Sequence, residues 1–294
     1  TDSTGFFGTV SGTKQLAGLR YTVAKATTVT VNAGQTLGVD GTIIVAPTVA
    51  GFNQTINGGM MTGANGGDLG IQQNSTGNFT INSQIVDNGG SIGFVKAGTG
   101  LVTLSNAGNS YTGATRVAQG TLAVSNIGNG GAASGIGASS AASSNLMLEG
   151  ATLSYTGTGN TSDRGFTFTK SGAILGSGVD VTNAAANLTF SGLVTSPDGA
   201  SFAKGGAGTL TLSNSANDFT GIVMVNGGLL SVNTLANGGV VSGIGSGTYA
   251  PTSAVLVPRP VNGDGHHAAS PSSTTRPDDH DSMRVWPSSS TTRS

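Results

Sequence analysis

Apolar and polar residues alternate along most of this chain, in short runs separated by glycine, asparagine and serine. The runs LVTLS (101–105) and GTLAVS (120–125) place every second side chain on one face, which is typical of strands with one buried side. Similar runs occur at 27–45, 77–86, 114–118, 145–155 and 164–175. The links between runs, such as NAGNS (106–110), contain residues that tolerate the left-handed backbone angles of turns. The pattern therefore predicts an all-β protein with many turns.

One block of the sequence occurs twice. Residues 94–137 align with residues 202–245 without a gap, and 22 of the 44 positions are identical. Weaker matches upstream extend the two copies to about 78–137 and 187–245. A repeat at a fixed interval, here 108 residues, is typical of solenoid proteins, in which each unit stacks on the last.

Two architectures fit the strands and the repeat: a series of β-sandwiches or a parallel β-helix. In a β-helix, coils of roughly 20–25 residues stack about 4.8 Å apart. The interval between the copies would then hold about five coils, and residues 1–257 would form a rod of about eleven coils, roughly 50 Å long. The glycine-rich, aromatic-poor composition favours the second architecture, a right-handed parallel β-helix over residues 1–257.

The composition is poor in charge and rich in glycine. Charged residues make up 9% of the chain and the net charge is −1, which argues against nucleic acid or an anionic membrane as a partner. Cysteine is absent, which excludes disulfides and thiolate metal sites. No run of 18 apolar residues occurs, so we expect no transmembrane helix and no direct insertion into a membrane. The first residues show no signal peptide and no Met, which predicts a mature product or a piece of a longer protein.

The composition changes sharply near Val257. Residues 258–294 contain five of the eight prolines, all three histidines and the only tryptophan, and they contain no Leu, Ile or Phe. No apolar period in this segment would bury a face. The sequence therefore predicts a disordered tail over 258–294.

The repeated block resembles the passenger-associated repeat of bacterial autotransporters. The first copy reads KAGTGLVTLSNAGNSYTGATRVAQGTLAV (96–124), and the second reads KGGAGTLTLSNSANDFTGIVMVNGGLLSV (204–232). The motif positions are Lys96, Gly98, Gly100, Leu104, Asn106, Tyr111 and Gly113 in the first copy, and Lys204, Gly206, Gly208, Leu212, Asn214, Phe219 and Gly221 in the second. The second copy departs from the motif at Phe219, where Tyr is preferred.

The resemblance implies a fold, a location and a role. It implies a secreted or surface-displayed passenger of a Gram-negative bacterium, folded as a parallel β-helix. In that family the repeat is associated with passage of the passenger across the outer membrane and with its folding there. We therefore expect the motif positions to be structural rather than catalytic.

The motif predicts where several of its residues lie in a coil. We expect Val102 and Leu104 to face the interior, Asn106 and Asn109 to form a turn, and Tyr111 to start the next strand. Tyr111 and its counterpart in the second copy are expected to pack in the core, although stacking on a sugar is an alternative.

The lysine of each copy also recurs at an equivalent position. Lys96 and Lys204 are expected to be solvated and to protect a β surface against edge pairing, with a ligand-binding pair as the alternative.

The sequence gives little evidence of a catalytic site. Glycoside hydrolysis needs two neighbouring carboxylates, and coil stacking would at best bring together Asp163 with Asp180, or Asp198 with Asp218. No histidine precedes His266, so most of the chain lacks the usual general base. We therefore predict no catalytic, cofactor-binding or metal site and no enzymatic activity.

Three functions fit these features. The first is a structural stalk or adhesin-type passenger segment at the cell surface, which contacts a host surface, glycans or other bacterial surface proteins. The second is a β-helical carbohydrate-active enzyme, which requires a cleft with clustered acids. The third is an extracellular matrix or filament protein that associates with itself through open β-helix ends.

Overall fold

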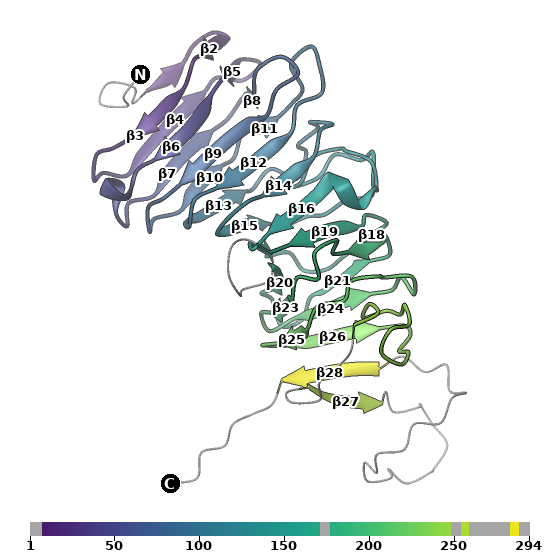
Figure 1. The fold of residues 1–294 in the computed structure, drawn as a ribbon. Helices are drawn as coiled ribbons and strands as arrows, with labels where there is room; N and C mark the ends of the chain where they lie inside the picture. The colour runs from purple at the N-terminus through teal and green to yellow at the C-terminus, as the bar shows by residue number, and fades with distance from the viewer. Residues whose placement is uncertain (1–7, 171–176, 248–253, 259–282, 288–294) are drawn as a thin grey trace, which may run out of the picture.

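The computed structural model describes residues 8–170, 177–247, 254–258 and 283–287, and within them the chain forms a parallel β-solenoid (Figure 1). No α-helix occurs among these residues, which contain only two 3-10 turns, at Pro47–Val49 and Ser143–Asn145. The all-β prediction and the β-helix prediction are confirmed.

A ten-stranded parallel sheet runs through the whole stack and contributes one strand to each coil. In spatial order its strands are β1 (Thr9–Val10), β4 (Thr27–Val31), β7 (Gln54–Asn57), β10 (Phe79–Ile81), β13 (Leu101–Leu104), β15 (Thr121–Val124), β17 (Thr152–Tyr155), β20 (Ser177–Val181), β23 (Phe202–Gly205) and β25 (Val223–Val225). Ten strands in this order correspond to about nine turns of the solenoid.

An eight-stranded sheet forms a second face. Its strands are β3 (Leu19–Tyr21), β6 (Thr42–Val45), β9 (Leu69–Gln73), β12 (Phe94–Ala97), β14 (Thr115–Val117), β16 (Leu146–Glu149), β19 (Phe166–Thr169) and β22 (Val194–Thr195). Strands of the first and second faces alternate along the chain as far as β22 and β23, whereas the last coil, from β23 to β25, has no strand in the eight-stranded sheet.

Strands of two smaller sheets come after strands of the ten-stranded sheet along the chain. Early coils use a four-stranded sheet of β2 (Lys14–Leu16), β5 (Thr36–Val39), β8 (Met60–Thr62) and β11 (Gln84–Ile85). Later coils use a six-stranded sheet of β18 (Asn160–Ser162), β21 (Asn187–Phe190), β24 (Thr209–Leu212), β26 (Leu229–Val232), β28 (Met283–Pro287) and β27 (Ala254–Pro258).

The core is a column of like residues stacked from coil to coil, because alternate side chains of each parallel strand point inward. One inward row joins Val29, Ile56, Ile81 and Leu104 in register, and each is at most 1% exposed. Later coils fill the column with rings. Phe166, Phe168, Phe190, Phe202 and Phe219 form contacts with centroids 5.2–6.3 Å apart. The column therefore becomes more aromatic toward the C-terminal coils.

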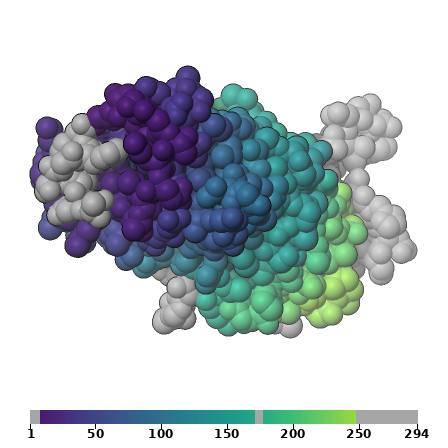
Figure 2. Space-filling model, turned by 90° about the horizontal axis from the view of Figure 1, so that it is seen from above, coloured from purple at the N-terminus to yellow at the C-terminus, as the bar shows by residue number. Residues whose placement is uncertain are grey.

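The coils are longer and less regular than the repeat interval predicted. Paired positions Val102 and Leu122 are 20 residues apart, whereas Leu122 and Leu153 are 31 apart. The prediction of about eleven coils was therefore too high, because insertions lengthen individual coils. The stack also bends. Strands before β15 and strands after β20 run in different directions in Figure 1, and from above the later coils lie to one side of the first ones (Figure 2).

The predicted tail, 258–294, lies largely outside the described residues. Within it the structure describes β28, which pairs antiparallel with β26 and with β27. The strand β27 crosses the boundary predicted after Val257. The sequence pattern of the tail did not predict β28.

Candidate functional site

The two repeat copies form equivalent strands on different faces of the solenoid. The first copy supplies β12, β13, β14 and β15, and the second supplies β23, β24, β25 and β26 at matching positions. However, β12 belongs to the eight-stranded sheet and β23 to the ten-stranded sheet. The eight-stranded sheet leads from β12 through β14, β16 and β19 to β22, and β23 then follows on the next face. The interval is therefore four coils and one further face, and the prediction of five coils was wrong.

The repeat lysines are buried, which contradicts the expectation that they are solvated. Lys96 and Lys204 are both 0% exposed. The Lys96 ammonium donates to the carbonyl oxygen of Gly98 in its own turn and to that of Gln119 in the next coil, the latter at 2.8 Å. It therefore joins two coils. Burial is tolerated because main-chain oxygens replace water around the ammonium.

The second lysine repeats this arrangement. Lys204 donates to Gly206 O at 2.9 Å and to Gly227 O at 3.0 Å, which are the positions equivalent to those used in the first copy. Desolvation lowers the pKa of both lysines to about 8, and the nearby Asp180 carboxylate partly offsets this for Lys204. The same bonds in two copies identify the lysine as a structural clamp between coils.

The motif glycines allow the coils to approach this closely. Gly98 and Gly206 have φ of +78° and +72°, and a Cβ on either would lie 2.3 Å from a carbonyl oxygen of the preceding coil. At the other four motif glycines an added Cβ would lie 1.8–2.5 Å from such an oxygen; these are Gly100, Gly113, Gly208 and Gly221. Only glycine fits where two main chains meet at this distance.

A buried asparagine forms a second clamp. Asn109 Oδ1 accepts from the Ile85 N–H at 2.9 Å, and its Nδ2 donates to Gly135 O at 3.3 Å. In the second copy, Asn217 makes the equivalent bonds to Val194 N and Gly243 O, both at 2.9 Å. The sequence predicted a turn role for Asn109, and the structure shows in addition that its side chain links its coil to the preceding one and to a later loop.

The other motif asparagine is more exposed and closes the turn. Asn106 Oδ1 accepts from the Gly108 N–H at 2.9 Å, and Nδ2 donates to the carbonyl of Asn82 in the preceding coil at 3.1 Å. Asn214 makes the equivalent pair of bonds to Ala216 and Ser191. The turn predicted after Leu104 is confirmed.

Tyr111 and Phe219 are fully buried, so the expectation of core packing is confirmed. Tyr111 does not start a strand, however, because the next strand begins at Thr115. The Tyr111 hydroxyl bonds Thr115 Oγ1 at 2.7 Å, and burial raises the pKa of the phenol. The second copy has Phe219 and Val223 at these positions. Both hydroxyls of this bond are thus absent together, so neither is left without the other in the second copy, which explains the departure from the motif.

The SGIG run that ends each copy forms a closed loop against this ring. Ser134 Oγ donates to Gly137 O, and Ser242 Oγ donates to Gly245 O, each at 2.8 Å. The N–H of Ala138 then donates to Tyr111 O at 2.8 Å. The loop therefore covers the end of the motif in both copies.

Sequence reasoning missed the group that holds the first loop in place. Arg164 is 1% exposed and donates to Gly128 O at 2.9 Å, Gly137 O at 3.0 Å and Ser139 Oγ at 2.7 Å. Burial lowers the pKa of this guanidinium. Its only sequence signal is an arginine in a charge-poor stretch, which does not distinguish a buried group from a solvated one.

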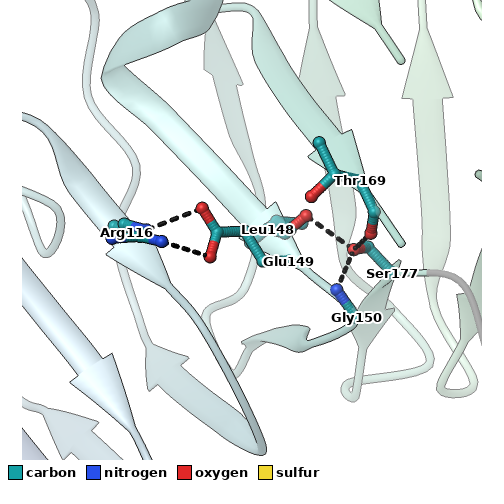
Figure 3. Close-up of polar contacts among 6 residues, drawn as sticks. All are labelled: Arg116, Leu148, Glu149, Gly150, Thr169 and Ser177. Atoms are coloured by element: carbon teal, nitrogen blue, oxygen red, sulfur yellow. Dashed lines mark hydrogen bonds and ion pairs between the residues drawn. The ribbon is translucent and has the colours of Figure 1, made fainter. Parts of the chain in front are cut away.

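Beside the first copy, a surface ion pair and a buried serine join further coils (Figure 3). Arg116 on β14 forms two bonds to Glu149 at the end of β16, at 2.6 and 2.8 Å, in the one ion pair among the described residues. Ser177 Oγ donates to Leu148 O at 2.7 Å and accepts from the Gly150 N–H at 3.0 Å. The exposed pair contributes little to stability, whereas the serine satisfies main-chain groups in the interior.

One acid of each possible catalytic pair has its own structural partner. Asp163 accepts from the Gly130 N–H, and Asp198 accepts from the Lys170 N–H, both at 2.7 Å. Burial raises the pKa of Asp180, and Lys204 lies close enough to oppose this shift. No cluster of three metal-ligating residues occurs in the part of the chain that the structure describes. Within the same ranges, no helix has the length and apolarity needed to cross a membrane.

Comparison with known proteins agrees with the repeat geometry. The family model of the passenger-associated-transport-repeat matches residues 94–124 and 202–232. The chain is 53% identical over 261 residues to the adhesin BmaC autotransporter of Brucella suis biovar 1 (strain 1330). That alignment covers 88% of this chain and 8% of the relative, so the chain spans a small part of that protein. No solved structure matches the chain.

Proposed function

We propose that this chain, which is a passenger segment of the autotransporter type and carries two passenger-associated-transport repeats, works as a rigid adhesin-type stalk. Such passengers are displayed outside a Gram-negative cell or at its surface. The continuous ten-stranded sheet supports a mechanical role, since each coil satisfies the main-chain hydrogen bonds of the next. A stalk of this kind holds binding faces at a distance from the membrane.

The observation that carries the proposal is the pair of clamps found in both repeats. Lys96 and Asn109 each bond a main-chain group of another coil, and Lys204 and Asn217 repeat those bonds at equivalent positions. Each side chain is buried, so its hydrogen bonds form only when the neighbouring coil is already in place. The repeats therefore couple the folding of successive coils, which suits a passenger that folds after crossing a membrane.

We also propose that the segment is not an enzyme. The related Brucella protein is named an adhesin. The candidate acids are used to hold loops, as described for Asp163 and Asp198, rather than arranged as a catalytic pair. The segment would then act by contact alone, on a host surface or on another bacterial surface protein.

The test couples the purified chain to latex beads and measures their adherence to epithelial cells. Beads coated with the folded chain are expected to adhere more than beads coated with heat-unfolded chain. A parallel incubation with polysaccharides measures release of reducing ends. Equal adherence of the two bead types would overturn the adhesin role, and sustained release of reducing ends would overturn the non-enzymatic one.

A further inference from the structure

Outward-facing threonines form a ladder on the first coils of the ten-stranded sheet. Thr28, Thr55, Thr80 and Thr103 lie in register on β4, β7, β10 and β13. A second outward column beside them contains Thr30, Asn57, Asn82 and Ser105. All eight side chains are exposed or half-buried. We call these eight residues the hydroxyl ladder.

Hydrogen bonds orient five of the eight ladder side chains, namely those of Thr80, Thr103, Asn57, Asn82 and Ser105. Asn78, which lies beside the ladder, donates through Nδ2 to Thr80 and to Thr103, each at 3.1 Å. In the second column, Asn82 Nδ2 bonds Asn57 Oδ1 at 3.4 Å, and Ser105 bonds Asn82 Oδ1. Because these five side chains are already oriented, binding of a ligand at this face would cost the protein little of their side-chain entropy.

The ladder presents hydrogen-bonding capacity without charge. Its side chains are hydroxyls and amides, which both donate and accept, and none of them ionises. A threonine hydroxyl has one proton and two lone pairs, so bonds within the ladder leave capacity for a partner. A charged partner would lose its hydration here and gain no opposite charge in return. The face therefore suits a neutral, hydroxyl-rich partner.

An exposed aromatic ring lies at one end of these strands. Phe52 is 45% exposed, whereas the other phenylalanines and tyrosines described by the structure are buried. It lies three residues before Thr55, and Asn53 between them bonds the N–H of Asn78 at 2.9 Å. A ring in this position presents an apolar surface beside polar groups. A sugar has the same combination, because its C–H face can stack on the ring while its hydroxyls bond the polar groups.

We propose that the hydroxyl ladder and Phe52 bind a neutral polysaccharide along the solenoid axis. The proposal rests on the proposed function and names the partner class of one face. Coils repeat about every 4.8 Å, so the ladder offers an equivalent donor and acceptor group at each step to an extended polymer. Binding is weak at each step and accumulates over four coils.

The test is affinity electrophoresis of the full 294-residue chain through gels that contain a neutral galactomannan or the anionic polysaccharide alginate. The wild-type chain is expected to be retarded by galactomannan and not by alginate. The double variant Thr55→Val/Thr80→Val keeps the β-branched shape and removes two hydroxyls, and Phe52→Ala removes the ring. Each variant is expected to weaken retardation by galactomannan about threefold to tenfold.

The matched control is Thr42→Val/Thr195→Val, which removes two hydroxyls from the eight-stranded sheet and is expected to bind as wild type does. Circular dichroism of each variant establishes that it is folded. Absence of retardation, stronger retardation by alginate, or equal losses in test and control variants would each overturn the proposal. Bead adherence that persists while galactomannan binding is absent would favour a protein partner. It would refute this inference and leave the stalk and adhesin role intact.

Discussion

Replacing Lys96 with methionine tests whether the buried lysine clamps two coils. Methionine has a similar apolar stem and no ammonium, so the change removes the bonds to Gly98 O and Gln119 O while filling most of the same space. The Gly98 carbonyl is buried, so loss of the donor leaves its oxygen without this partner in the interior. Gln119 is an exposed residue, and its carbonyl oxygen is more accessible to water once the donor is lost.

Two effects of opposite sign determine how much Lys96→Met changes the free energy of unfolding. Each unsatisfied buried carbonyl costs about 1–3 kcal/mol, whereas removing a buried charge recovers part of the desolvation cost of the ammonium. The loss of the bond to Gly98 O is larger, because this carbonyl cannot move away from the closely packed turn. We expect Lys96→Met to lower the free energy of unfolding by about 1–3 kcal/mol. Lys204→Met provides an internal replicate with the same geometry and should lose a similar amount.

The assay is urea unfolding followed by circular dichroism, with the exposed Lys14→Met as the control. The control should stay within about 0.5 kcal/mol of wild type. Unchanged stability of both Lys96→Met and Lys204→Met would refute the clamp. A loss in the control as large as in the test variants would also refute it, because a general effect of charge would then explain the result.

The same lysines predict a pH dependence whose sign is opposite to that of a paired surface lysine. Their folded-state pKa of about 8 lies below the ordinary lysine value of 10.5, so between these values the unfolded chain binds more protons. Stability should therefore rise with pH from about 8 toward 10, by at most about 1.4 kcal/mol per unit for each lysine. Above that range Tyr21 and Tyr111, whose pKa values burial raises, should reverse the trend. A flat profile in wild type, or an unchanged slope in the double Lys→Met variant, would contradict this.

Three further substitutions test other contacts. Asn109→Leu should cost about 2–4 kcal/mol, because an amide and a carbonyl of other coils lose their partner; a urea midpoint equal to that of wild type would argue against the clamp. Gly137→Ala should cost more than Gly131→Ala in thermal unfolding. Both have positive φ, but a Cβ at Gly137 would lie 2.6 Å from the Tyr111 ring and one at Gly131 meets nothing within 4 Å. Arg164→Met should cost about 3–5 kcal/mol and expose the first loop to proteolysis, and unchanged cleavage there would contradict its assigned role.

Strands and inward-facing positions could be predicted from the sequence, since alternation reports directly which side of a strand is buried. Val102 and Leu104 are buried as expected, and the turn at Asn106 follows where the alternation stops. The same reasoning was wrong for the two lysines, because residue type alone predicts that a lysine is exposed to water. The useful signal was their position: Lys96 and Lys204 each precede two glycines at the same spacing, in a chain with few charges.

The length of individual coils and the role of Arg164 could not be predicted. Coil length depends on loop insertions such as the one between β15 and β16, which a solenoid accommodates on its surface without disturbing register. Arg164 satisfies carbonyls that become neighbours only after this loop folds back on the stack. Arg164 lies outside both aligned copies, 94–137 and 202–245, so comparison of the repeats could not identify it.

The shift of the second copy by one face has a consequence for the surfaces that the solenoid presents. The equivalent strands β13 and β24 each carry the run LTL or VTL, with a threonine pointing outward. Thr103 of the first copy lies on the ten-stranded sheet, whereas Thr211 lies on the six-stranded sheet, where it is in register with Thr189 and Ser231. A repeat placed at a whole number of coils would extend one ladder along one face. Because the interval includes one additional face, the same short sequence instead builds outward threonine ladders on two faces of a single solenoid.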